Sequence, residues 1–204
     1  MSSVLRSAPS SPSARLIARL SAGLASGLVA VALVPPAPAV AAKGAVTLTS
    51  TYTCESPAGS GSSQVSIATS LPGSVKAGSR VKARALQASI TVPPELVDYL
   101  RQYGVESISG SVKDARYRVG AKKVGLTTVL PTTPVPASGG MTLRGKGRAG
   151  AFSIATPGTY AVRIPASFVA KVTARTRSFG DVRAALTCTL AKGAPSKLGS
   201  LKVR

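Results

Sequence analysis

Two cysteines stand near the two ends of a strongly alternating sequence, and their placement constrains the fold more than any other feature. Residues 46–54 place threonine at every second position and apolar or small side chains between, and residues 186–190 repeat this pattern. Such period-two alternation indicates half-buried strands. Cys54 and Cys188 both fall on the apolar face. We therefore predict two strands whose inward faces carry the two sulfurs.

The first 41 residues have the pattern of a secretory signal peptide. Arg6, Arg15 and Arg19 form a positive segment, residues 20–34 are apolar and uncharged, and small residues after a proline cluster predict cleavage after Ala41. The alternative is an uncleaved membrane anchor, but the apolar run is shorter than the roughly 20 residues that span a bilayer. We predict a secreted, extracellular product with no transmembrane anchor in the mature chain.

An exported chain meets oxidising conditions, where a pair of thiols tends to form a disulfide. Two free thiols or a redox pair are the alternatives, although a redox pair would normally be spaced as C-x-x-C. We predict a structural Cys54–Cys188 bond between the first and last core strands. Closing so long a loop stabilises a fold by at most about 5 kcal/mol in the chain-entropy model.

The chain between the cysteines predicts one all-β domain over residues 42–204. A short helix at about 94–103 follows two prolines, and Leu96, Val97, Leu100 and Tyr103 form its apolar stripe, which we expect to cap the sheets rather than bind a partner. Residues 56–63 and 131–140 are predicted as loops, and a β-bulge near Ala85 is expected. Further strands are predicted at residues 64–69, 81–92, 107–119, 152–155, 159–164, 169–177, 182–190 and 198–203. We expect 152–155 and 159–164, and likewise 169–177 and 182–190, to form hairpins. The predicted architecture is a β-sandwich.

The composition argues against catalysis. The chain has no His, and its six carboxylates show no motif spacing. Residues 145–150 match G-x-G-x-x-G, but a strand pattern follows them where dinucleotide binding needs a helix. We predict no enzyme, no catalytic or metal-binding residue and no cofactor; a Ser-Lys or paired-carboxylate enzyme and a protease inhibitor stay open as alternatives.

The charge points to anionic partners. The formal net charge is +20, from 26 basic and six acidic residues. Such a charge attracts teichoic acids, anionic lipid head groups, acidic polysaccharides or extracellular nucleic acid; the alternative is a merely solvated surface. Few aromatic residues accompany the cations, so sequence-specific nucleic-acid binding is not expected. The candidate anion-binding residues are Arg116, Arg118, Lys122, Lys123, Arg144, Lys146, Arg148, Arg175 and Arg177.

Five segments carry a resemblance that spans the chain after the signal. They are Tyr52-Thr53-Cys54, residues 71–78, residues 92–96, residues 134–139 and Leu186-Thr187-Cys188. In this order they resemble a domain of unknown function found in secreted actinobacterial proteins. The resemblance implies an immunoglobulin-like sandwich and export, and it implies no activity.

Together, these features predict a secreted, non-catalytic immunoglobulin-like module with a structural or binding role at the cell envelope. They do not specify its ligand. The alternative is a basic polyanion-binding protein, held at the cell wall by anionic polymers such as teichoic acid, anionic polysaccharide or extracellular nucleic acid.

Overall fold

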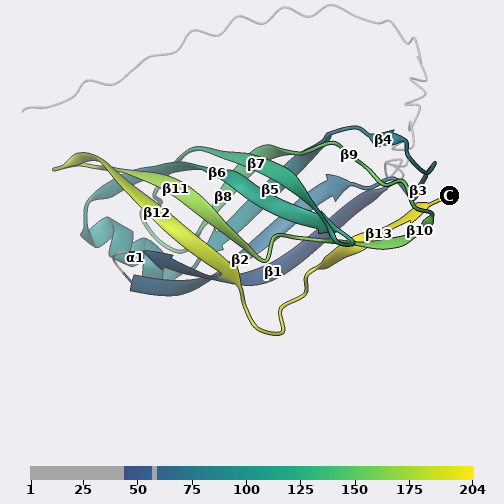
Figure 1. Cartoon of the computed structure of the whole chain (residues 1–204). Helices are drawn as coiled ribbons and strands as arrows, with labels where there is room; N and C mark the ends of the chain where they lie inside the picture. Colours follow the sequence, from purple (N-terminus) through teal and green to yellow (C-terminus); the bar gives the residue numbers. More distant parts are fainter. Residues whose placement is uncertain (1–43, 57–58) are drawn as a thin grey trace, which may run out of the picture. The chain divides into compact units, whose positions relative to one another are not determined.

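The structure, a computed structural model, describes residues 44–56 and 59–204. The predicted signal peptide of residues 1–41 lies outside the described residues. The described chain is a β domain with one short helix (Figure 1). Its elements in chain order are β1 (Ala45–Ser56), β2 (Gly59–Ser70), β3 (Ser74–Val75), β4 (Arg80–Val81), β5 (Arg84–Val92), α1 (Pro94–Gln102), β6 (Val105–Val119), β7 (Lys122–Pro134), β8 (Met141–Ala149), β9 (Phe152–Ser153), β10 (Gly158–Arg163), β11 (Ser167–Thr176), β12 (Gly180–Leu190) and β13 (Lys197–Val203).

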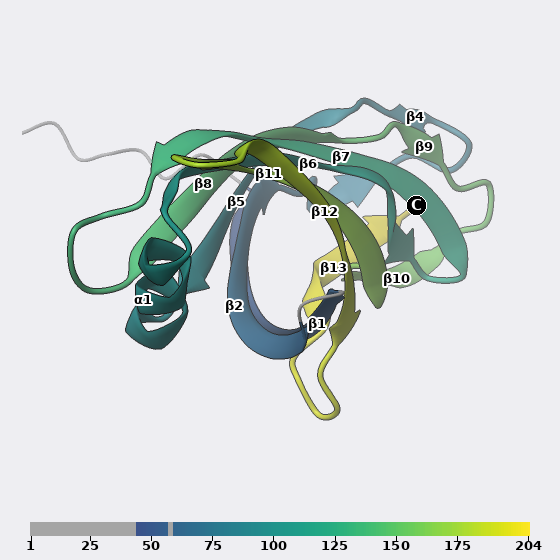
Figure 2. The ribbon, with the colours of Figure 1, turned by 90° about the vertical axis from the view of Figure 1, so that its left-hand side faces the viewer.

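Eight of the strands close into an antiparallel β-barrel. Their order is β11-β12-β1-β2-β5-β8-β7-β6, and β6 pairs again with β11 to complete the ring (Figure 2). The prediction of an immunoglobulin-like β-sandwich is therefore wrong. A sandwich keeps two separate sheets with free edges, whereas here one sheet curls until its first and last strands meet.

The long strand β6 makes this closure possible. Its register with β7 shifts between Ile108 and Gly110 and again between Val112 and Ala115. Such bulges bend a strand and increase its twist, which is the curvature that a closed sheet needs. Because of the bend, β6 pairs with β11 up to Lys113 and with β10 from Arg118 onward. Strand β10 then continues outside the ring to β13 and β3.

The predicted disulfide is confirmed. Cys54 and Cys188 lie opposite each other on β1 and β12, with their Cα atoms 4.0 Å apart and their sulfurs bonded. Beside them Tyr52 is fully buried, and its hydroxyl donates a hydrogen bond to the Pro165 carbonyl at 2.7 Å. Its ring packs edge-on against Phe168. The bond therefore joins the first strand to the last strand of the ring beside the main core.

The predicted helix is confirmed, and so in part is its capping role. Val97 is fully buried and belongs to a second apolar cluster at one end of the barrel, with Val105, Leu130 and Met141. Pro93 and Pro94 begin the helix as expected. The rest of the predicted stripe differs, because Leu96 and Tyr103 are exposed.

Four details of the strand prediction are wrong. Most of the segment 56–63, predicted as a loop, belongs to β2. Most of the segment 81–92 forms β5, which has no bulge; the strand is instead interrupted between Val81 and Arg84. Strands β9 and β10 do not form a hairpin, because β9 pairs with β4 and β10 with β13. Strands β7 and β8 were not predicted at all, and without them a closed ring could not be recognised. The hairpin of β11 and β12 is confirmed.

Candidate anion-binding surface

Six of the nine predicted anion-binding residues share one surface. They lie at outward, exposed positions of β6, β7 and β8, while their chain neighbours on these strands alternate inward. Because side chains alternate between the two faces of a strand and β8, β7 and β6 are neighbours in the sheet, all six cations lie on the outer face of the same part of the barrel. We call this surface the basic wall and include Arg163 of β10, because it lies opposite Arg118 of β6. The basic wall consists of Arg116, Arg118, Lys123, Arg144, Lys146, Arg148 and Arg163.

The wall contains an uninterrupted row of three cations. Arg118 of β6 lies opposite Lys123 of β7 on one side and opposite Arg163 of β10 on the other. Adjacent strands are about 4.8 Å apart, so this row places three positive charges within about 10 Å along the backbone. Sequence reasoning missed Arg163, because only the pairing of β10 with β6 brings it into the row.

A second line of cations runs along β8. Arg144, Lys146 and Arg148 alternate with inward residues, so their charges repeat about every 7 Å along the strand. Lys146 lies opposite the exposed Val129 of β7, and Arg148 lies opposite Thr127. Strands β7, β8 and β10 contain no Asp or Glu, so no carboxylate from these strands neutralises the wall.

The glycines between these cations explain the G-x-G-x-x-G match. Gly145 and Gly147 face inward on β8, where a Cβ atom would collide with Thr128 and, at Gly147, also with the Thr127 carbonyl. A Cβ atom on Gly150 would press on the Gly125 carbonyl. The glycines permit close packing of β8 on β7. The match lies on β8 and the residue after it, and strand β9 follows it where a dinucleotide-binding loop would lead into a helix.

The other three predicted cations, Lys122, Arg175 and Arg177, do not belong to the basic wall. Lys122 begins β7, and its Nζ atom donates a hydrogen bond to the Ser153 carbonyl at 3.0 Å. Arg175 and Arg177 belong to the hairpin of β11 and β12, where β11 pairs with the opposite end of β6. The structure therefore separates these two arginines from the wall.

Beside the wall lies a hollow that sequence reasoning also missed. It has a volume of about 440 Å³ and is lined by Lys113, Asp114, Lys171 and Val169, together with Ser167, Phe168 and Thr187. It forms where β6 changes partners between β11 and β10. Asp114 has a φ of 61°, a left-handed conformation that suits the second β6 bulge. No sequence signal marks this place, since it depends on strand pairing.

Two carboxylates among the described residues are paired with arginines. Asp98 pairs with Arg101 and Glu106 with Arg177, and no group of three or more metal-binding side chains occurs within 44–56 and 59–204. Burial raises the pKa of Tyr117 to about 12, and burial also raises the pKa of Tyr52. The hydroxyl of Tyr117 donates to the Gly150 carbonyl at 2.9 Å. These tyrosines are structural.

The fold and the surface together define a small antiparallel β-barrel domain, braced by one disulfide and carrying a basic outer wall. The chain belongs to the family of unknown function DUF6801, whose family model matches residues 51–199. No curated protein and no solved structure matches the chain. Among the described residues, no helix has the length and apolar character needed to cross a membrane.

Proposed function

We propose that this domain is a non-catalytic binding module that acts outside the cell and holds an anionic polymer against its basic wall. The observation that carries the proposal is the row Arg163-Arg118-Lys123, in which three cations occupy adjacent strands. The polymer class that fits is one with regularly repeated negative charges, such as a teichoic acid or an acidic polysaccharide.

The energetics of the row support a binding role. Like charges directly opposite each other on neighbouring strands destabilise a sheet. The domain carries two such pairs in one row, Arg118 with Lys123 and Arg118 with Arg163. A polymer whose charges span the row removes this repulsion on binding, so the surface gains most from a ligand with several linked anions rather than from a single ion.

The choice of polymer follows from what the wall offers. Its seven residues are all arginine or lysine, the outward positions that follow Lys123 on β7 carry Gly125, Thr127 and Val129, and none of these residues is aromatic. Recognition of single-stranded nucleic acid normally adds aromatic side chains on which bases stack. The wall therefore suits a polymer recognised by charge. Action outside the cell is supported by the signal-peptide pattern of residues 1–41 and by the disulfide.

The test compares two double variants that remove the same charge. Arg118→Gln with Lys123→Gln disrupts the wall, and Arg175→Gln with Arg183→Gln removes two arginines from the β11–β12 hairpin. Binding is measured against purified bacterial cell wall and against long-chain inorganic polyphosphate, over a salt gradient. We expect the wall variant to lose at least tenfold more affinity and to show a shallower dependence on salt.

Two outcomes would overturn the proposal. Equal losses in the two variants would mean that net charge alone attracts the polymer, without a defined surface. Absence of binding to both polymers at low salt would remove polymer binding altogether, because electrostatic attraction is strongest there.

A further inference from the structure

The hairpin of β11 and β12 ends in the most exposed large apolar side chain of the described residues. Phe179 has 81% of its surface exposed, although burial is the usual state of a phenylalanine. The chain has only five tyrosines, three phenylalanines and no tryptophan. A scarce aromatic side chain is therefore placed in water at a turn, which calls for an explanation beyond folding. We call residues 175–183 the hairpin tip.

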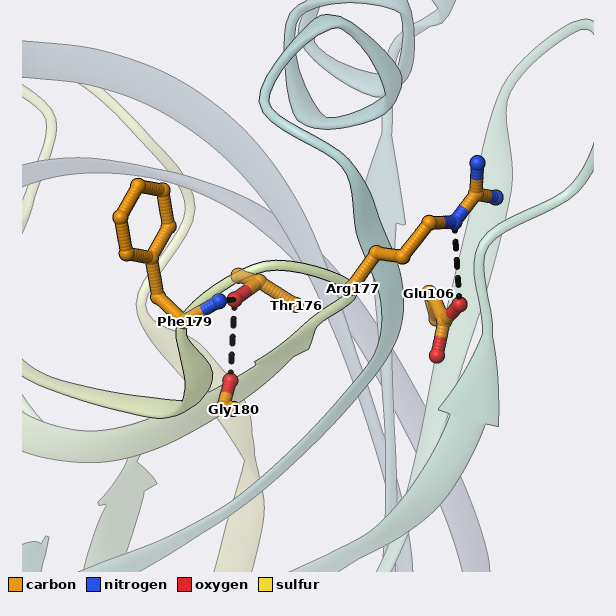
Figure 3. Close-up of polar contacts among 5 residues, drawn as sticks. All are labelled: Glu106, Thr176, Arg177, Phe179 and Gly180. Carbon is orange, nitrogen blue, oxygen red and sulfur yellow. Dashed lines mark hydrogen bonds and ion pairs between the residues drawn. The ribbon is translucent and has the colours of Figure 1, made fainter.

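The turn that presents Phe179 is held in one conformation (Figure 3). The backbone N–H of Phe179 donates to the Thr176 hydroxyl at 3.0 Å, and this hydroxyl donates to the Gly180 carbonyl, also at 3.0 Å. Gly180 has a φ of 66°, which its missing side chain permits. Thr176 itself is buried. The turn is thus ordered before any partner binds, which lowers the entropy lost on binding.

The hairpin tip is also fixed to the barrel. The backbone N–H of Arg177 donates to the Gly104 carbonyl at 3.0 Å, and the Arg177 side chain lies 3.4 Å from a carboxylate oxygen of Glu106. Figure 3 shows the Arg177 and Phe179 side chains pointing in different directions. The two contacts hold the base of the turn while Phe179 projects away from them.

More apolar surface lies at the same end of the barrel. The exposed Val182 follows on β12, and helix α1, which lies at this end, exposes Leu96, Tyr99 and Tyr103 (Figures 1 and 2). The rings of Tyr99 and Tyr103 are 4.5 Å apart, and their hydrogen bond raises the pKa of Tyr99. Five of the seven exposed large apolar side chains within the described ranges therefore lie on α1, at its C-cap or on the hairpin tip.

The charges around the tip suit a negative surface. Glu106 is paired with Arg177, and Asp181 lies opposite Arg175 in the strand register. Arg183 lies opposite Thr173 rather than opposite a carboxylate, so its positive charge is not balanced across the hairpin. The strong positive charge of the whole chain adds long-range attraction.

We propose that the hairpin tip docks on a lipid surface rich in anionic headgroups, with Phe179 inserted between the headgroups. Phe179 stands at the end of the hairpin rather than in a groove, so a deformable surface can close around the ring. An apolar ring gains by leaving water only where the occupant is itself apolar, and the headgroup–acyl boundary provides this next to negative charge. The tip is a different surface from the basic wall, and the inference does not depend on polymer binding.

The absence of tryptophan provides a direct test. In Phe179→Trp the new indole is the only tryptophan of the chain and reports on its surroundings. With vesicles of phosphatidylglycerol and phosphatidylcholine, we expect a blue shift of its emission and quenching by brominated lipid. With pure phosphatidylcholine vesicles we expect a much weaker response. Emission that stays unshifted while the protein sediments with the anionic vesicles would overturn the proposal.

A matched pair of variants measures the contribution of the ring. Phe179→Ser is expected to weaken vesicle binding by roughly tenfold or more, the value of burying one large apolar side chain. Val129→Ser is the control, because Val129 is 61% exposed but lies away from the tip, opposite Lys146 of the basic wall. Both variants should keep the parent melting temperature. Equal losses, or a loss in Val129→Ser alone, would place the lipid elsewhere and overturn the proposal.

The same reagents separate this inference from the polymer-binding proposal. Polyphosphate is expected to leave the indole emission of the Phe179→Trp variant unchanged and to bind Phe179→Ser as tightly as the parent. A blue shift caused by polyphosphate, or by raising the protein concentration without vesicles, would show a polymer or a second copy of the chain at the tip and would overturn lipid docking. Loss of polymer binding with an intact vesicle response would overturn only the proposed function.

Discussion

The basic wall and the hairpin tip differ in charge, in aromatic content and in packing. The wall places cations over buried side chains of β6 and β7, such as Tyr117 and Leu126. The tip mixes three arginines with one carboxylate, that of Asp181, and exposes Phe179. Strand β12 pairs with β1 only from Thr187 to Leu190, so its tip end runs past β1, while β11 stays paired with β6 as far as Thr176. The same sheet thus carries the charged basic wall, which lies over the core, and the hairpin tip, which exposes an apolar side chain.

This difference shows how a barrel with few aromatic residues separates two kinds of surface. Where a strand has neighbours on both sides, its inward residues fill the core and its outward residues are free to vary. Where β12 runs past β1, its residues Gly180 to Ala185 are exposed on both faces, and an apolar side chain there is not needed for the core. The two regions should therefore respond differently to the same kind of change.

The largest effect is expected from removing the disulfide with Cys54→Ser and Cys188→Ser. We expect the free energy of unfolding to fall by up to about 5 kcal/mol, because the unfolded chain regains the freedom of a long loop. Denaturant unfolding measures this loss. Since the bond lies at the base of β12, hydrogen exchange should rise more in β11 and β12 than in β7 and β8. A uniform rise across both pairs would contradict the comparison.

The next prediction compares two glycines. Gly147→Ala on β8, between two residues of the basic wall, should lower the free energy of unfolding by about 3 kcal/mol. The new Cβ meets the backbone of β7 and overpacks the strand pair. Gly180→Ala at the tip should cost about 1 kcal/mol, because the site has open space and only its left-handed φ is unfavourable. Thermal and denaturant unfolding of the two variants measure both values. A larger loss for Gly180→Ala would show that the tip is packed more tightly than described.

The third prediction concerns alkaline pH and the tyrosine beneath the wall. The folded pKa of Tyr117 is raised to about 12, so between about pH 10 and 12 the unfolded chain ionises this group while the folded domain keeps its proton. Stability should therefore be intact below pH 10 and fall as the pH rises, by about 1 kcal/mol at pH 11 from this residue. Tyr117→Phe should show a shallower fall. An identical pH profile in the variant would contradict the assignment.

The smallest effect has the opposite sign. Arg118→Thr should raise the free energy of unfolding by about 0.5 kcal/mol, because it removes the central charge of the row Arg163-Arg118-Lys123. The matched change at the tip, Arg183→Thr, should leave stability unchanged, since Thr173 lies opposite it. Raising the salt concentration should reduce the gain at Arg118. A loss of stability in Arg118→Thr would show that the row is not repulsive.

Much of the local structure could be predicted from residues alone. The alternation around Cys54 and Cys188 indicated two strands with inward sulfurs, and the pair of prolines before Glu95 indicated the start of a helix. Strands β7 and β8 escaped prediction because threonine, proline, glycine and basic residues weaken the apolar pattern on which strand prediction depends. Without these two strands, the remaining ones suggested a sandwich.

The candidate surface was predictable only as a set of separate charge clusters. Alternation correctly placed Arg116 and Arg118 on one face of a strand, but it could not indicate that β10 brings Arg163 beside them. Nor could it separate Arg175 and Arg177 from the wall. The hollow next to Asp114 left no signal, because it arises where β6 exchanges one partner strand for another.

The sequence by itself determined the strands near the cysteines, the disulfide, the helix start and the positive charge, because each depends on neighbouring residues or on composition. Only the tertiary structure decided that the sheet closes, which cations share a wall, and that Phe179 stands in water. These features depend on which strands pair and in what register. Alternation determines which way a side chain points within its strand, but the partner of that strand is chosen by contacts far along the chain.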